Sequence, residues 1–212
     1  MNLAIIGASE MALELFNLII SCNEKNKYEK IFYVDLTENK EKHIISETDF
    51  FQTDRNKSKI LIAMGEPFMR KKMLEKYIKN GFTLTTFIHP LSFISNDTIV
   101  KEGSIIFPHV YIAQGTTIEN NVAIHAGSKI ENDCQIGDNC FISSNAFIGA
   151  KTSIKDTCFV GPGASIRDSL TIGCDTIIGM GSIVTKSIED NYICFGNPAQ
   201  PIRKNTAKRV FK

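Results

Sequence analysis

An unbroken six-residue period constrains this chain more than any other feature of its sequence. Counting in sixes from Ile88 to Val184, all seventeen positions are isoleucine or valine, and the run ends at Asp190. A second column, two residues before each of these positions, holds mostly small or β-branched residues. Strands of a doubly wound sheet do not repeat every six residues over such a length, so that alternative is rejected. The pattern predicts a parallel β-helix shaped as a triangular prism, in which three hexads close one coil and the aliphatic residues stack inward about 4.8 Å apart.

Glycine and cysteine occupy particular places in this repeat. Three of the six cysteines, Cys134, Cys140 and Cys158, fall in the small-residue column, and the chain has no C-x-x-C pair or other metal-ligand spacing. We therefore expect buried, reduced thiols rather than a zinc site or a disulfide framework. Five glycines directly follow the aliphatic position, where we expect the backbone to turn and a side chain to be in the way: Gly137, Gly149, Gly161, Gly173 and Gly179.

Residues 1–87 show no six-residue period. Strand and helix patterns alternate there, which predicts a small parallel α/β domain with a Rossmann-like order of elements. The expected strands are 3–7, 30–35, 59–65 and 83–88, and the expected helices are 10–22 and 67–80. We expect the β-helix over residues 88–190 and a C-terminal cap over residues 191–212, with a turn at Gly196-Asn197-Pro198.

Composition excludes several classes of function. The net charge is +1, so no electrostatic footprint for nucleic acid or for an anionic membrane is expected. No apolar stretch is long enough to span a bilayer. The chain enters a strand pattern at once, without a basic leader or cleavage site, which favours a cytoplasmic location.

A nucleotide could bind where the first strand pattern ends. The turn Gly7-Ala8-Ser9 opens a helix whose N-terminus could hold a phosphate. The full dinucleotide fingerprint is absent, so NAD is not expected. Asp35, at the end of the second strand, could hold a ribose or base, or could be an ordinary solvated carboxylate. Gly65 follows the third strand into the same crevice, and Arg70 could reach a phosphate or face water.

These features together resemble a known family, the bacterial left-handed β-helix acyltransferases with an N-terminal nucleotide-binding α/β domain. It includes nucleotide-amino-sugar N-acetyltransferases and sialic acid O-acetyltransferase-like proteins. The resemblance rests on the hexads and on Gly7-Ala8-Ser9, Ile62-Ala63-Met64-Gly65 with Arg70, Ile88-His89-Pro90 and Gly196-Asn197-Pro198-Ala199.

The resemblance implies a homotrimer that uses acetyl-CoA and no metal. Acetyl-CoA would lie between neighbouring β-helices, lined by Ala150, Pro162, Met180, Gly181, Asn197 and Pro198. The N-terminal domain of one subunit would hold a nucleotide sugar, with Met64 joining Gly7, Ser9, Asp35, Gly65 and Arg70 at this substrate. Pro162 and Met180 are one coil apart, which suits a long pantetheine arm.

The chain departs from the family at the expected catalytic base. Where relatives have a stretch like I-E-H-E-C, this chain has Ile130-Glu131-Asn132-Asp133-Cys134, and asparagine cannot take a proton at neutral pH. Seven residues earlier, His125 stands where some relatives have asparagine. Because His125 follows the inward Ile124, we expect it to point outward from a prism corner, on the same side of the prism as Asn132 and close to it. We expect His125, Asn132 and Glu131 to line the acceptor, with His125 as a possible base. His125 could also be a lone exposed side chain.

The absence of the usual histidine indicates which chemical group of the substrate accepts the acetyl group. A hydroxyl needs a base in the transition state, whereas an amine of modest pKa already offers a lone pair near neutral pH. We therefore expect N-acetylation of a nucleotide-linked amino-deoxy sugar, such as a dTDP- or UDP-4-amino-4,6-dideoxy sugar, for surface glycan (lipopolysaccharide) synthesis. The alternatives are an O-acetyltransferase acting on a sugar or sialic acid, with His125 as base, and an inactive scaffold that binds a nucleotide sugar.

Aromatic residues outside the inward column favour assembly. Too many of them are present to be left in water, so we expect some to pack between subunits of a trimer, and others under the N-terminal domain or the cap. They are Phe93, Phe107, Tyr111, Phe141, Phe147 and Phe159.

Overall fold

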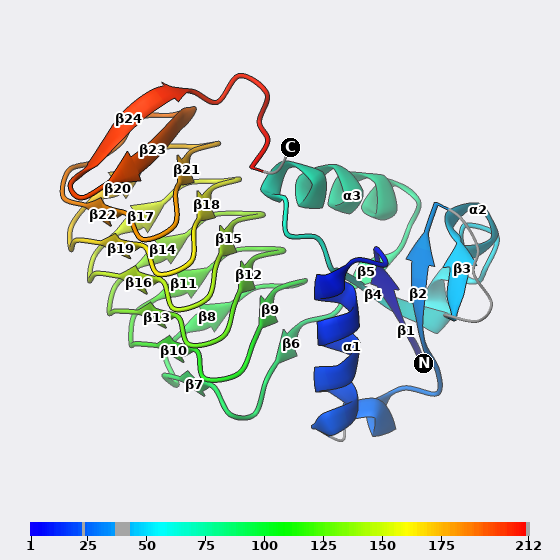
Figure 1. The fold of residues 1–212 in the computed structure, drawn as a ribbon. Coiled ribbons are helices and arrows are strands. Elements are labelled where there is room, and N and C mark those ends of the chain that lie inside the picture. Colours follow the sequence, from blue (N-terminus) through cyan, green and yellow to red (C-terminus); the bar gives the residue numbers. More distant parts are fainter. Residues whose placement is uncertain (23, 37–42, 211–212) are drawn as a thin grey trace. The chain divides into compact units, whose positions relative to one another are not determined.

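The computed structural model describes residues 1–22, 24–36 and 43–210 (Figure 1). The chain divides into two compact units. Unit 1 comprises Met1–Gly65 and Met69–Thr86, and unit 2 comprises Glu66–Phe68 and Phe87–Lys212. Among the described residues no helix is long and apolar enough to cross a membrane.

Unit 1 is built on a five-stranded parallel sheet with the strand order β3-β2-β1-β4-β5. Its strands are β1 (Asn2–Ile6), β2 (Ile31–Asp35), β3 (Ile44–Ser46), β4 (Ser58–Ile62) and β5 (Thr83–Leu84). The helices of this part of the chain are α1 (Glu10–Ser21), α2 (Glu47–Phe50) and α3 (Pro67–Lys79), with the short 3-10 segments η1 (Glu24–Lys27) and η3 (Arg55–Lys57). The predicted parallel α/β class is confirmed. Strand β3 and helix α2 lie between the expected strands 30–35 and 59–65, where no strand or helix was predicted.

The two faces of this sheet are covered by different side chains. On one face α1 buries Met11, Leu15 and Ile19, and Phe16 packs on Tyr33 of β2 with ring centroids 5.4 Å apart. The other face holds an aliphatic and aromatic cluster: Ala4, Ile6, Val34, Phe50, Ile60, Ile62, Tyr77, Phe82 and Leu84. Alternate residues of each strand therefore point to opposite layers, as strand geometry requires.

Unit 2 is a parallel β-helix, which confirms the interpretation of the hexads (Figure 1). Each two-residue strand pairs with the strand 18 residues away, as Ile118 does with Ile136. Face 1 consists of β6 (Phe87–Ile88), β9 (Ile105–Ile106), β12 (Ala123–Ile124), β15 (Phe141–Ile142), β18 (Phe159–Val160) and β21 (Ile177–Ile178). Face 2 consists of β7 (Phe93–Ile94), β10 (Tyr111–Ile112), β13 (Lys129–Ile130), β16 (Phe147–Ile148), β19 (Ser165–Ile166) and β22 (Ile183–Val184). Face 3 consists of β8 (Ile99–Val100), β11 (Thr117–Ile118), β14 (Gln135–Ile136), β17 (Ser153–Ile154) and β20 (Thr171–Ile172).

Polar atoms of the small-residue column are satisfied inside the prism. Thr116 and Thr152 donate their hydroxyl protons to the carbonyls of Glu131 and Arg167, 3.0 and 3.1 Å away. The Cys158 thiol makes the same kind of contact with the carbonyl of Gly173 at 3.0 Å. In each case the acceptor lies 15 residues further along the chain. A hydroxyl or thiol therefore replaces an apolar side chain here without leaving a buried polar atom unsatisfied.

The backbone turns at a different column from the one predicted. None of the five glycines that follow the aliphatic position is among the residues with a positive φ. Instead, every sixth residue from Gly103 to Gly181 is left-handed, and most of these residues are Gly, Asn or Asp. The expectation that a side chain would be in the way at the five glycines is confirmed. A Cβ on Gly137 would lie 2.7 Å from the backbone nitrogen of Asp156 in the next coil.

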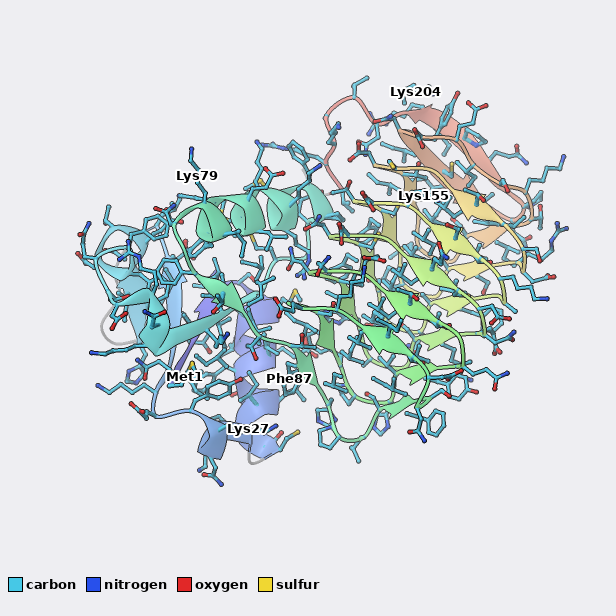
Figure 2. The ribbon with its side chains drawn as sticks, turned by 180° about the vertical axis from the view of Figure 1, so that it is seen from behind. Met1, Lys27, Lys79, Phe87, Lys155 and Lys204 are labelled. Atoms are coloured by element: carbon cyan, nitrogen blue, oxygen red, sulfur yellow. The ribbon has the colours of Figure 1, made fainter. Side chains whose placement is uncertain are left out.

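Residues 83–88 are not one strand, so that prediction is wrong. Thr83–Leu84 pairs with β4 in the α/β sheet, whereas Phe87–Ile88 pairs with β9 in the β-helix. An extended segment can serve two sheets because each pairing needs only two residues. Figure 2 marks Phe87 at this entry into the β-helix.

The far end of the β-helix carries a hairpin. Strand β23 (Tyr192–Gly196) pairs in parallel with β21, and β24 (Ala199–Lys204) pairs antiparallel with β23. The turn between them includes Asn197 and Pro198. Figure 2 marks Lys204 at the end of β24.

Candidate active site

The strand order of unit 1 reverses between β1 and β4, and ligands of open parallel sheets bind at such a point. Gly7 leaves β1 there with φ +103°. Its N–H donates to the carbonyl of Val34 at 2.8 Å. A Cβ on Gly7 would lie 3.3 Å from the carbonyl oxygen of Ala63, so glycine suits both the backbone conformation and the close approach of the two turns.

Three successive carbonyls at the end of β4 are all engaged by side chains. Arg70 Nη1 donates to the carbonyls of Ile62 and Met64, at 2.6 and 3.0 Å. Ser9 Oγ donates to the carbonyl of Ala63 between them, at 3.2 Å. Arg70 is completely buried, so the alternative that it faces water is wrong.

A cavity of about 420 Å³ begins at the α1 N-terminus. Its lining residues are Ala8, Ser9, Glu10, Leu13, Phe16, Asn17, Tyr33, His43 and Ile44. The Tyr33 hydroxyl is buried and has no hydrogen-bond partner in the described parts of the chain, and its burial raises the pKa of Tyr33. Half-buried Asp35 ends β2 and accepts the Leu36 N–H at 2.7 Å. Of the predicted substrate residues, Ser9 alone lines this cavity. Tyr33 was not predicted from the sequence, because a tyrosine within a strand pattern is expected to pack in the core.

His125 lies at the corner between faces 1 and 2 of the β-helix. It is half-buried rather than exposed, so the interpretation as a lone exposed histidine is wrong. Its ring stacks on Phe107 with centroids 4.0 Å apart and contacts Phe141 at 5.1 Å. Phe107 is one coil before His125, a spacing that could have revealed this contact from the sequence.

Glu131 and Asn132 lie at the next corner, between faces 2 and 3, and both are half-buried. Asn132 Nδ2 donates to a carboxylate oxygen of Asp133 at 2.9 Å. Within one chain, His125 and Asn132 therefore stand at opposite edges of face 2. The expectation that they lie close together on one side of the prism is not met within a single chain.

The predicted cofactor residues also fall on more than one edge. Pro162, Met180 and Gly181 are exposed at the corner between faces 1 and 2, and the Gly181 N–H donates to the Pro162 carbonyl at 2.9 Å. A Cβ on Gly181 would meet nothing within 4 Å, so this corner is open for a ligand. Ala150 lies at the corner between faces 2 and 3. Asn197 and Pro198 are exposed in the hairpin turn.

The cysteines do not supply a nucleophile in the prism. Cys134, Cys140, Cys158 and Cys194 are buried and form no disulfide. Burial raises the pKa of the Cys134 thiol and raises that of Cys158 well above its usual value. These side chains therefore stay neutral near pH 7 and pack as small residues. In the described residues, no three His, Cys, Asp or Glu side chains gather in a way that could hold a metal ion.

Comparisons with known proteins found similarities to parts of both halves of the chain. The PglD N-terminal domain family matches residues 2–77, and the bacterial transferase hexapeptide (six repeats) family matches residues 115–150. The acetyltransferase domain of PglB from Neisseria gonorrhoeae FA1090 is similar, with a TM-score of 0.88 and 25% identity over 95% of this chain and 99% of that chain. The same domain in complex with acetyl coenzyme A gives a TM-score of 0.87 at 25% identity, over 95% of this chain and 98% of that one.

A further solved structure shares the fold. It is a histidine-to-alanine variant of GDP-perosamine N-acetyl transferase from Caulobacter crescentus, in complex with CoA and GDP-perosamine. Its TM-score is 0.86 at 24% identity, covering 96% of this chain and 98% of that chain.

The fold and these similarities indicate an acetyl-CoA-dependent acyltransferase, and its prism is the left-handed parallel β-helix that the resemblance implied. The chain carries a PglD-type N-terminal domain over residues 2–77 and a bacterial transferase hexapeptide repeat over residues 115–150.

Proposed function

We propose that the chain transfers an acetyl group from acetyl-CoA to the amino group of a nucleotide-linked amino-deoxy sugar. The observation that carries this proposal is the similarity to the PglB acetyltransferase domain over 95% of the chain, which includes both units. The similar proteins supply the two ligand classes, because one was solved with acetyl coenzyme A and another with CoA and GDP-perosamine. In this proposal the product serves surface glycan synthesis in the cytoplasm.

The reaction needs few groups from the protein. The amine nitrogen attacks the thioester carbonyl, the C–N bond forms and the C–S bond breaks. The proton that the nitrogen releases balances the one that the departing thiolate takes up. An amine of modest pKa presents its lone pair without a base, so Asn132 can serve as a hydrogen-bonding positioner where proton removal would need a histidine. The exposed corner at Pro162, Met180 and Gly181 would receive the pantetheine arm.

An assay of acetyl transfer by the purified protein tests the proposal directly. Acetyl-CoA is incubated with UDP-, dTDP- and GDP-linked 4-amino-4,6-dideoxy sugars, and CoA release is followed together with the mass of the sugar nucleotide. We expect CoA release and a gain of one acetyl group with at least one of them. No transfer to any of these amines, despite calorimetric binding of acetyl-CoA, would contradict the proposal. Absence of acetyl-CoA binding would favour the inactive scaffold.

One observation favours O-acetylation as a second candidate. The His125 ring is held between Phe107 and Phe141, an arrangement that would orient a catalytic base. In an O-acetyltransferase, His125→Ala should lower kcat/KM by about 10²–10⁴-fold. In an unassisted N-acetyltransferase the same variant should lose less than about tenfold, and the pH profile should follow the amine of the substrate. Asn132→Ala is the matched variant at the other corner of face 2.

A further inference from the structure

Helix α1 begins without a side-chain cap, because the hydroxyl of Ser9 is bonded elsewhere. Ser9 is the N-cap residue of α1, but its side chain makes no capping hydrogen bond. Its hydroxyl points instead to the Ala63 carbonyl, at 3.2 Å. Serine at this position ordinarily accepts a hydrogen bond from a first-turn N–H group. The first-turn N–H groups of the 12-residue helix α1 therefore have no side-chain cap.

Arg70 holds the backbone on both sides of Ala63, whose carbonyl accepts the hydrogen bond from Ser9. Its Nη1 atom bonds the carbonyls on either side of Ala63, those of Ile62 and Met64. With both neighbours held from inside the unit, the Ala63 carbonyl is left to face Ser9 and Gly7. The guanidinium also places a positive charge beneath the turn, because arginine stays protonated even when completely buried.

A second feature of the same place indicates a ligand. The cavity of about 420 Å³ begins at Ser9 and Glu10 and also contains Tyr33. Tyr33 is 8% exposed, and its hydroxyl lacks a partner within the described residues. A buried hydroxyl without a partner is rare in folded proteins, and in the wall of a cavity it offers a hydrogen bond to a polar ligand.

We propose that Arg70 is a positioning residue for the diphosphate of the nucleotide-linked substrate. By holding the end of β4, Arg70 keeps the Ser9 hydroxyl off the N-terminus of α1, which leaves these N–H groups to a phosphate. This inference rests on the proposed function, since it assumes a nucleoside diphosphate group in the substrate. The Arg70 side chain acts through Ala63 and Ser9 and through its charge, and it does not touch the ligand.

The test separates the phosphates from the rest of the ligand. Calorimetry measures the affinity of the wild-type chain for UDP, dTDP and GDP and for the matching nucleosides uridine, thymidine and guanosine. In Arg70→Met we expect the affinity for the diphosphate that binds best to fall by at least about tenfold, because charge and carbonyl contacts are both lost. The affinities for the nucleoside and for CoA should change little. Arg70→Lys keeps the charge and should lose less.

Ser9→Asp provides a variant that does not disturb the core. Aspartate is a strong N-cap residue, so the thermal midpoint should be kept or raised while its carboxylate occupies the phosphate position. We expect the diphosphate affinity to fall by at least about tenfold, whereas Ser9→Ala, which leaves the helix end open, should lose less than about threefold.

Each outcome decides the matter. The inference is contradicted if Arg70→Met lowers the affinities for the nucleoside and for the diphosphate equally. It is also contradicted if the diphosphate affinity is unchanged in either Arg70→Met or Ser9→Asp. Neither result would contradict the proposed function. If Arg70→Met does not fold, Ser9→Asp with Arg70→Lys decides in the same way. If the wild-type chain binds none of the three diphosphates, the proposed function fails together with the inference.

Discussion

Glycine has two distinct tasks in the coils of the β-helix, and the two tasks differ in energy. Gly161 has no space for a side chain, because an added Cβ would lie 2.6 Å from the backbone nitrogen of Met180 and 2.8 Å from the carbonyl carbon of Gly179. Gly163 has open space around it but a φ of +64°. The first glycine is required by packing between coils, and the second only by backbone conformation.

Two alanine variants separate these tasks. Gly161→Ala should destabilise the chain by about 3 kcal/mol, because neighbouring backbone must move apart. Gly163→Ala should lose only about 1 kcal/mol, the usual penalty for a left-handed non-glycine residue. Urea unfolding followed by circular dichroism measures both. Equal losses would show that the coils relax around the added methyl group.

At the scale of single elements, the terminal hairpin ties its stability to a protonated thiol. Cys194 on β23 pairs with Ile178 of β21 and is completely buried. Burial raises the pKa of its thiol from 9 to about 11. The folded chain therefore binds a proton more tightly than the unfolded chain between these two values.

The sign of the pH dependence follows from this linkage. The contribution of Cys194 is complete below about pH 9 and is lost as the pH rises toward 11. We expect the free energy of unfolding to fall over this range, and to fall less steeply in Cys194→Ala. Cys22→Ala, outside the β-helix, is the control and should keep the wild-type slope. Identical slopes in all three proteins would contradict the prediction.

For the whole molecule, the aromatic residues outside the prism divide into two groups. Phe107, Phe141 and Phe159 are already buried in the single chain. Phe93, Tyr111 and Phe147 are 59%, 39% and 38% exposed, and all three belong to face 2. Ile183 on the same face is 39% exposed. Face 2 is also the face whose two edges carry His125 and Asn132, so copies packed on it would bring candidate residues of different chains together.

We propose a homotrimer formed through face 2. Light scattering should give about 70 kDa, three times the 23.6 kDa chain. Phe147→Asp places a charge in the middle of this face and should shift the protein toward monomer, with acetyl transfer lowered by at least about tenfold. Gln135→Glu, an exposed change on face 3, should leave mass and activity as they are. A fully active 23.6 kDa wild-type monomer would rule out both the trimer and a shared site.

Periodicity was sufficient to predict the architecture. The Ile and Val column specifies the β-helix because the residue at this position must point inward in every hexad, whatever its neighbours are. The alternation of strands and helices before residue 88 was also a local pattern, and it was sufficient to predict the parallel α/β class. The turn at the left-handed column was missed, although its Gly, Asn and Asp residues carry the signal in the sequence.

Local pattern also determined which residues were candidates, but only the tertiary structure decided their neighbours. The sequence places Arg70 on a helix after β4, and burial with two carbonyl bonds follows from how that helix packs. By contrast, the hexad register alone places His125 and Asn132 at successive corners of one coil, so their positions at opposite edges of face 2 could have been predicted from the period. The physical reason is that periodicity reports which side of the backbone a residue occupies, whereas contacts between distant segments depend on packing that no local pattern encodes.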